Sequence, residues 1–266
     1  MANCLVLTGF GINCEQECLW ALELAGAKKA EIIHISQILE GEKKLINYQF
    51  IVFPGGFLDG DDLGSAKVQV NRFNYAKIKN NREKLIDSLK EFIEKGNLAL
   101  GICNGFQFMV KAGIIPDIDK SNNFKQTTTL TFNDSGRFED RWVYLTVNKN
   151  SPCIFTDGLD HLYLPVRHGE GKFYCESDTL KKIEKNNLFV LQYSTSDYKP
   201  TMEYPDNPNG SLLSIAGICD TSGRLFGLMP HPEAFIYPYH HPRWTREKIE
   251  DPDGLKIFKN ALKYFK

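Results

Sequence analysis

Cys103 lies in the stretch GICNG, with one glycine two residues before it and another two residues after it. This is the sulfur version of the G-x-S-x-G turn, in which a sharp bend from a strand into a helix exposes a nucleophile. The apolar run at 98–102 predicts the strand, and residues 105–112 predict the helix. The free amides and positive dipole end of such a helix favour a thiolate. The alternative is a small buried thiol, as most free cysteines are.

A thiolate that attacks an acyl carbon needs a base, a group that orients the base, and donors for the oxyanion. Two histidines are followed two residues later by a glutamate: His168 by Glu170, and His231 by Glu233. Either pair offers an imidazole held by a carboxylate through its second ring nitrogen. Glycines flank Glu170, whereas prolines flank His231, and a general base must be held in place. We therefore prefer His231 with Glu233, and keep the other pair as the alternative.

Backbone amides are the expected donors to the oxyanion. Asn104 directly follows the thiol and offers one of them. The stretch PGGF at 54–57 follows a predicted strand, and its glycines permit a second amide to approach closely. An ordinary Pro-Gly turn has the same sequence, so both interpretations of this stretch stay open.

No metal site is predicted. The acidic residues at 59, 61 and 62 do not match the spacing of a calcium loop. Cys14 and Cys18 share a helix face, but two further zinc ligands at suitable spacing are missing.

The elements that must position these groups alternate in the first half of the chain. Strands are predicted at 3–8, 31–35, 50–53 and 98–102, and helices after a cap at Asn13, at 81–95 and at 105–112. This alternation predicts an α/β fold with a flavodoxin-like, mostly parallel sheet and helices on both faces.

The second half predicts an antiparallel β addition. Short strands at 127–132, 142–147 and 188–193, a hairpin formed by 212–218 and 224–228, and a last helix at 255–265 are expected. We expect a single domain over residues 1–266. The connections at 57–80, 114–126 and 234–253 are long, and long loops in compact domains are often functional.

Composition narrows the function classes. Lys and Arg total 32 against 33 for Asp and Glu, so a general attraction to nucleic acid or to anionic membranes is not expected. No run of about 18 apolar residues predicts a membrane span. Seven scattered cysteines, an odd number without a CxxC pair, favour reduced thiols and a cytoplasmic location.

The motifs together resemble a known family. PGGF at 54–57, GICNGFQ at 101–107 and MPHPE at 229–233 occur in the order found in class I (triad) glutamine amidotransferases. HGEG at 168–171 and the triplet NCE that begins at Asn13 extend the resemblance to the glutaminase subunits of phosphoribosylformylglycinamidine synthase, an enzyme of de novo purine synthesis. The similarity runs from about residue 4 to residue 235.

The resemblance implies a role for each matching position. Cys103 would be the nucleophile, His231 the general base and acid, and Glu233 its orienting group. The amides of Gly56 and Asn104 would hold the oxyanion, and Gln107 would help to seat L-glutamine. The roles of the HGEG loop, the 57–80 loop and the tail after Glu233 are left open.

The resemblance also implies partners. Ammonia would pass to a separate synthetase subunit that carries ATP and Mg²⁺, and a small bridging subunit remains open. No cofactor is expected in this chain, which lacks a G-x-x-x-x-G-K-[ST] loop. The stretch PGGFLDGDD departs from the commoner PGGFSYGD, and the tail after Glu233 is longer than expected. Both departures concern loops at the site mouth or the partner interface.

Two alternatives remain. One is a triad amidotransferase or small cysteine hydrolase of another pathway, and the other is a non-catalytic subunit that only binds a synthetase.

Overall fold

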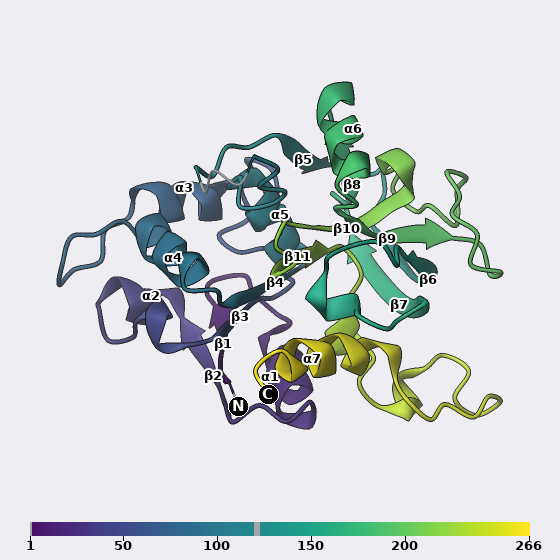
Figure 1. Ribbon diagram of the computed structural model, residues 1–266, viewed down its shortest axis with the longest axis horizontal. Coiled ribbons are helices and arrows are strands. Elements are labelled where there is room, and N and C mark those ends of the chain that lie inside the picture. Colours follow the sequence, from purple (N-terminus) through teal and green to yellow (C-terminus); the bar gives the residue numbers. More distant parts are fainter. Residues whose placement is uncertain (1, 120–122) are drawn as a thin grey trace.

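The computed structural model describes residues 2–119 and 123–266. The chain forms a nine-stranded sheet (Figure 1). Its first five strands, in the order β2-β1-β3-β4-β11, are parallel. They are β1 (Asn3–Thr8), β2 (Lys29–His34), β3 (Phe50–Phe53), β4 (Leu98–Ile102) and β11 (Leu225–Leu228). This is the 2-1-3-4-5 order of flavodoxin-like sheets, so the predicted fold class is confirmed.

The antiparallel addition continues the same sheet. Beyond β11 the order is β10-β9-β6-β7, and each neighbouring pair is antiparallel. These strands are β10 (Ile215–Cys219), β9 (Phe189–Ser194), β6 (Glu139–Val147) and β7 (His161–His168). The predicted hairpin is β10 with β11, although residues 212–214 form a 3₁₀ turn before it. The strand predicted at 127–132 forms as β5 (Thr128–Thr131), but it pairs with β8 (Lys172–Cys175) in a separate small sheet.

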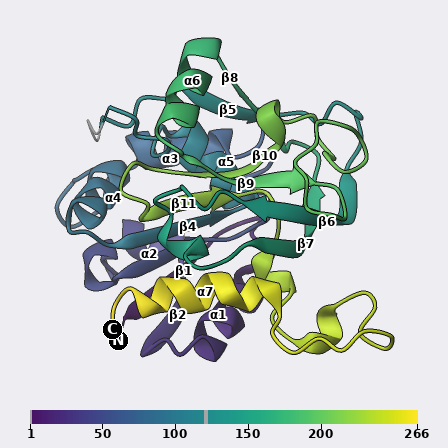
Figure 2. The ribbon, with the colours of Figure 1, turned by 45° about the vertical axis from the view of Figure 1, so that its right-hand side comes forward.

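Helices cover both faces of the parallel half (Figures 1 and 2). Helices α1 and α7 lie together on one face, and α3, α4 and α5 lie on the other. Their bounds are α1 (Glu15–Leu24), α3 (Lys67–Tyr75), α4 (Leu85–Glu94), α5 (Asn104–Lys111) and α7 (Asp253–Lys263). The short α2 (Ile35–Leu39) follows β2, and α6 (Ser177–Lys185) follows β8. No helix within the described residues is long and apolar enough to cross a bilayer.

Several local predictions are wrong. No helix was predicted in the connection at 57–80, but this connection contains α3. Its valines at 68 and 70 alternate with polar residues, which is the pattern of a strand and not of a helix. The helix predicted from 81 begins at Leu85, because Arg82 has a φ of 58° and an isolated bridge joins Lys77 to Lys84. The N-cap of α1 is Cys14 and not Asn13, and no side chain caps it. Of the connection at 114–126, residues 120–122 lie outside the described part of the chain.

The start of α5 is pressed against the sheet at a distance that only glycine permits. A Cβ atom at Gly105 would lie 1.9 Å from the carbonyl oxygen of Phe53. A Cβ atom at Gly101 would lie 2.6 Å from Sδ of Met109 and 2.7 Å from the carbonyl oxygen of Gly105. The two glycines of the GICNG stretch therefore serve strand–helix packing, and this packing fixes where α5 begins.

We expect Gly105→Ala to lower the free energy of unfolding by at least about 2 kcal/mol, because the added methyl group meets rigid backbone of β3. Urea denaturation of the variant and the parent chain measures this difference. Gly169→Ala is the matched control, since its Cβ would meet only Phe138 at 3.9 Å. Equal stability of the Gly105 variant and this control would contradict the packing argument.

Candidate active site

A cavity of about 540 Å³ opens where the parallel strands end. Four of the five parallel strands contribute residues that follow their carboxyl ends: Cys14 after β1, Gly56 after β3, Cys103 after β4 and His231 after β11. Ligands of open α/β sheets bind at this edge. Five of the six predicted site residues line the cavity, and the sixth, Asn104, is buried directly after Cys103.

Cys103 has a backbone conformation that non-glycine residues rarely adopt. Its φ is 49° and its ψ is −102°, between the end of β4 and the first residue of α5. The Cys103 amide donates to the carbonyl oxygen of Leu228 at 2.8 Å, and its Sγ lies 3.5 Å from the carbonyl oxygen of Arg167. Such strained turns occur where a strand-to-helix elbow presents a nucleophile.

His231 is held from two sides. Its Nδ1 lies 2.6 Å from Oε1 of Glu233, and its backbone amide donates to the carbonyl oxygen of Pro165 at 2.8 Å. Both side chains are buried. Among the described residues Nε2 has no hydrogen-bond partner, although it is buried. The ring is therefore fixed through Nδ1, and Nε2 is left for chemistry in the cavity.

Charge around His231 favours its protonated form. Burial lowers the pKa of the imidazole, but the Glu233 carboxylate and then Cys103 outweigh burial and raise this pKa well above its usual value. An imidazolium beside a cysteine stabilises the thiolate, which is the form that attacks carbonyl carbon.

The alternative pair, His168 and Glu170, does not form a histidine–carboxylate contact in this structure. Nδ1 of His168 lies 3.1 Å from Oδ1 of Asn133. Burial, with a contribution from His231, lowers the pKa of His168 to about 3, so this ring is neutral near pH 7. The Glu170 carboxylate instead accepts the Ser65 amide at 3.1 Å and lies 3.3 Å from Nζ of Lys111.

Asn104 and Gln107 connect two loops to the start of α5. The Asn104 side chain accepts the Leu58 amide at 3.2 Å and donates to Oε1 of Gln107 at 3.1 Å. Gln107 in turn donates through Nε2 to the carbonyl oxygen of Glu170 at 2.7 Å. The amide of Asn104 lies at the first position of α5, where a helix offers no internal acceptor. It is thus free to serve as a donor.

Gly56 lies where the loops after β1 and β3 meet. Its φ is 141°, and a Cβ there would lie 2.6 Å from the carbonyl oxygen of Gly11. The neighbouring Phe57 amide donates to that same oxygen at 2.8 Å. This contact holds the PGGF stretch at the cavity wall.

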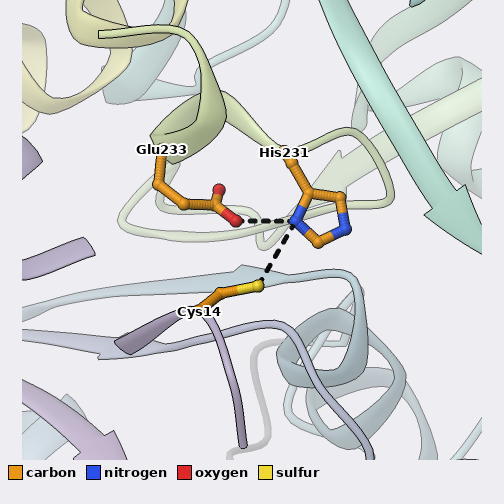
Figure 3. A group of neighbouring side chains, drawn as sticks. All are labelled: Cys14, His231 and Glu233. Carbon is orange, nitrogen blue, oxygen red and sulfur yellow. Dashed lines mark hydrogen bonds and ion pairs between the residues drawn. The ribbon is translucent and has the colours of Figure 1, made fainter. Parts of the chain in front are cut away.

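The cavity also holds residues to which sequence reasoning gave no role at the site. Cys14 lies with its Sγ 3.9 Å from Nδ1 of His231, as Figure 3 shows. Arg167, Phe132 and Phe138 line the wall on the side of the antiparallel strands. The sequence signals for Cys14 were the NCE triplet and its spacing from Cys18, and neither indicated a contact with His231. No comparable signal marked the other three residues.

A second cavity, of about 580 Å³, lies away from this edge. It is lined by residues such as Ser151, Cys153 and Asp157, together with Asn260 and Lys263 of α7. None of the predicted site residues belongs to it, so the candidate active site is the cavity at the strand ends.

The fold and the groups that line this cavity indicate the class of protein to which the chain belongs. The family model for the CobB/CobQ-like glutamine amidotransferase domain matches residues 1–265. A solved glutaminase domain of Trypanosoma brucei CTPS has the same fold, with a TM-score of 0.53 and 14% identity over 99% of this chain and 94% of that one.

Closer relatives define a group within this class. The chain is 47% identical, over 98% of its length and 96% of the relative, to the phosphoribosylformylglycinamidine synthase subunit PurQ of Dehalococcoides mccartyi. It is 44% identical to the PurQ subunit of Methanococcus maripaludis, over 98% of this chain and 96% of that one. A solved structure of PurLQS from Thermotoga maritima matches over the full length of both chains, with 28% identity and a TM-score of 0.71. The chain therefore belongs to the PurQ family of glutamine amidotransferases.

We expect Glu233→Gln to lower the pKa of His231, because burial is then opposed by the two cysteines, Cys103 and Cys14, without the carboxylate charge. NMR titration of protein labelled with ¹⁵N in its histidines measures this pKa. Glu170→Gln is the control, since its carboxylate faces Lys111 and Ser65. If His231 titrates at the same pH in the parent and in the Glu233 variant, the assigned cause of the raised pKa is wrong.

Proposed function

We propose that this chain hydrolyses L-glutamine to glutamate and ammonia through a thioester on Cys103. The ammonia then serves the ATP-dependent conversion of formylglycinamide ribonucleotide to formylglycinamidine ribonucleotide in purine synthesis. The observation that carries the proposal is the strained Cys103 turn, which opens into the same cavity as the buried, unpartnered Nε2 of His231. Membership of the PurQ family supports glutamine as the substrate.

The proposed reaction follows from these groups. The Cys103 thiolate attacks the side-chain carboxamide carbon of glutamine, and the amides of Gly56 and Asn104 stabilise the oxyanion that forms. His231 gives its Nε2 proton to the departing ammonia, which leaves a γ-glutamyl thioester. Nε2 then takes a proton from water as the water attacks the thioester, and glutamate is released. Glu233 holds the ring through Nδ1 in both steps, and Gln107 at the cavity wall helps to seat the substrate.

The proposed partner is a separate synthetase subunit that binds ATP and Mg²⁺, with a small bridging subunit as a further component. The Thermotoga maritima relative was solved as PurLQS, and curated relatives are each called a subunit of phosphoribosylformylglycinamidine synthase, which supports an assembly with other subunits. We propose no cofactor in this chain and no nucleic-acid or membrane partner. A cytoplasmic location is supported by the free state of all seven cysteines.

The decisive experiment uses the chain together with its synthetase. We expect Cys103→Ala to lose glutamine-dependent amidine formation by at least about 10³-fold, because burial raises the pKa of Cys14, the other thiol that lines the cavity, and so disfavours its thiolate. The same complex should still form the amidine from added ammonium salt, since the synthetase site is intact. Cys175→Ser, on β8 outside the cavity, is the control and should support both reactions.

A glutamine-derived electrophile followed by mass spectrometry identifies the nucleophile independently. Label on any residue other than Cys103, or glutamine-dependent activity in Cys103→Ala, would refute the proposal. Faster turnover of another amide than of glutamine by the parent complex would favour a hydrolase of another pathway.

A further inference from the structure

Cys14, His231 and Glu233 lie close together although 217 residues separate the cysteine from the histidine. One ligand atom from each, the Cys14 Sγ, the His231 Nδ1 and a Glu233 carboxylate oxygen, lies within 4.8 Å of the other two. The three side chains are buried, and Figure 3 shows the thiol and the carboxylate approaching the same ring nitrogen. The glutaminase reaction proposed above uses Nε2 as the reactive atom, and it gives Cys14 no role.

Two further observations indicate that this cluster accepts a ligand. Oε2 of Glu233 is buried and has no hydrogen-bond partner among the described residues, which is costly for a carboxylate oxygen. All three side chains also line the cavity at the strand ends, so an ion has a path to them. Gly55 keeps that corner clear, because a Cβ there would lie 2.7 Å from Cε1 of His231 and 3.2 Å from the Cys14 Sγ.

We propose that Cys14, His231 and Glu233 form an inhibitory zinc site, in which Sγ, Nδ1 and a carboxylate oxygen bind one Zn²⁺ and a water completes the tetrahedron. A mixed sulfur, nitrogen and oxygen set suits Zn²⁺ better than Mg²⁺ or Ca²⁺, which prefer oxygen ligands. The binding of the ion does not rest on the proposed glutaminase function. The inhibition does.

Zinc binding would need only small changes in the distances between the three ligand atoms. Zinc bonds of about 2.3 Å to sulfur and 2.0 Å to nitrogen place these two atoms roughly 3.5 Å apart in a tetrahedron, and they are 3.9 Å apart here. Nitrogen and oxygen ligands would lie roughly 3.3 Å apart, against the 2.6 Å of the present hydrogen bond. The Glu233 carboxylate must therefore withdraw from the ring by under about 1 Å.

Zinc at Nδ1 would stop the reaction by fixing the protons of the ring. Binding displaces the Nδ1 proton and the Cys14 thiol proton to solvent, and no electrons are transferred. A neutral imidazole bound through Nδ1 carries its hydrogen on Nε2. Nε2 then has no lone pair to take the proton of the Cys103 thiol, and giving its own proton to ammonia would leave an imidazolate, so the thioester does not form. Because protons are released, zinc should bind more tightly as the pH rises.

Cobalt(II) titration of a Cys103→Ser variant tests the site without turnover and without the thiol of Cys103. We expect one equivalent of Co²⁺ to give a thiolate-to-cobalt charge-transfer band, which added Zn²⁺ abolishes. A further Cys14→Ser substitution should remove the band and weaken Zn²⁺ binding at least tenfold, measured by competition with a chromophoric chelator. Adding Cys175→Ser instead should leave both unchanged, because Cys175 lies on β8 outside the cavity.

Glu233→Gln in the same Cys103→Ser background distinguishes the loss of one zinc ligand from a failure of the protein to fold. It keeps the thiol, so the band should persist while Zn²⁺ binds more weakly. Absence of the band in Cys103→Ser, or its persistence after Cys14→Ser, would overturn the proposal. With Cys103 intact and the synthetase present, Zn²⁺ should inhibit glutamine hydrolysis by the parent chain at least tenfold more tightly than by the Cys14→Ser variant. If neither complex hydrolyses glutamine, the proposed function fails, and the cobalt band still decides the metal site.

Discussion

The backbone of Cys103 is held in a conformation that costs about 1–3 kcal/mol, and the rest of the site depends on what offsets this strain. Its amide is bonded to Leu228 of β11, and the helix that follows lies against β3 at the distance set by Gly105. Because both contacts come from the parallel sheet, the strain is balanced by the most deeply buried part of the fold. The thiol is therefore positioned by rigid elements and not by a loop.

Polar contacts extend this rigid core outward to the cavity wall. The Asn104 side chain holds the loop after β3 through Leu58, and Gln107 holds the loop after β7 through Glu170. Glu170 then fixes the segment before α3 through the Ser65 amide and Lys111. A residue that the sequence offered as a partner for a catalytic histidine thus stabilises two loops against each other.

Sequence patterns predicted those parts of the molecule that depend on local spacing. The alternation of strands and helices indicated the parallel sheet, and the glycines around Cys103 indicated the turn. The stiffness of the prolines beside His231 favoured the pair with Glu233, and the structure shows that pair in contact, while its catalytic role stays a prediction. Helix α3 was missed because its valines at 68 and 70 alternate with polar residues. The contacts of Cys14 with His231 and of Glu170 with Ser65 depend on how distant loops meet, which no local pattern encodes.

The late position of strand β11 in the sequence affects how the chain folds during its synthesis. It lies between β4 and β10, so it is the last strand of the parallel half and pairs with the first strand of the antiparallel half. In the sequence, however, it comes late, at residues 225–228. During synthesis the segment with Cys103 leaves the ribosome long before this strand, and the amino-terminal part can begin to fold first. Until β11 inserts, the Leu228 carbonyl is not available to the Cys103 amide, and His231 is not beside the thiol. In a nascent chain Cys103 therefore lacks both the contact that holds its backbone and the histidine that lines the same cavity, and it gains them only when the sheet is complete.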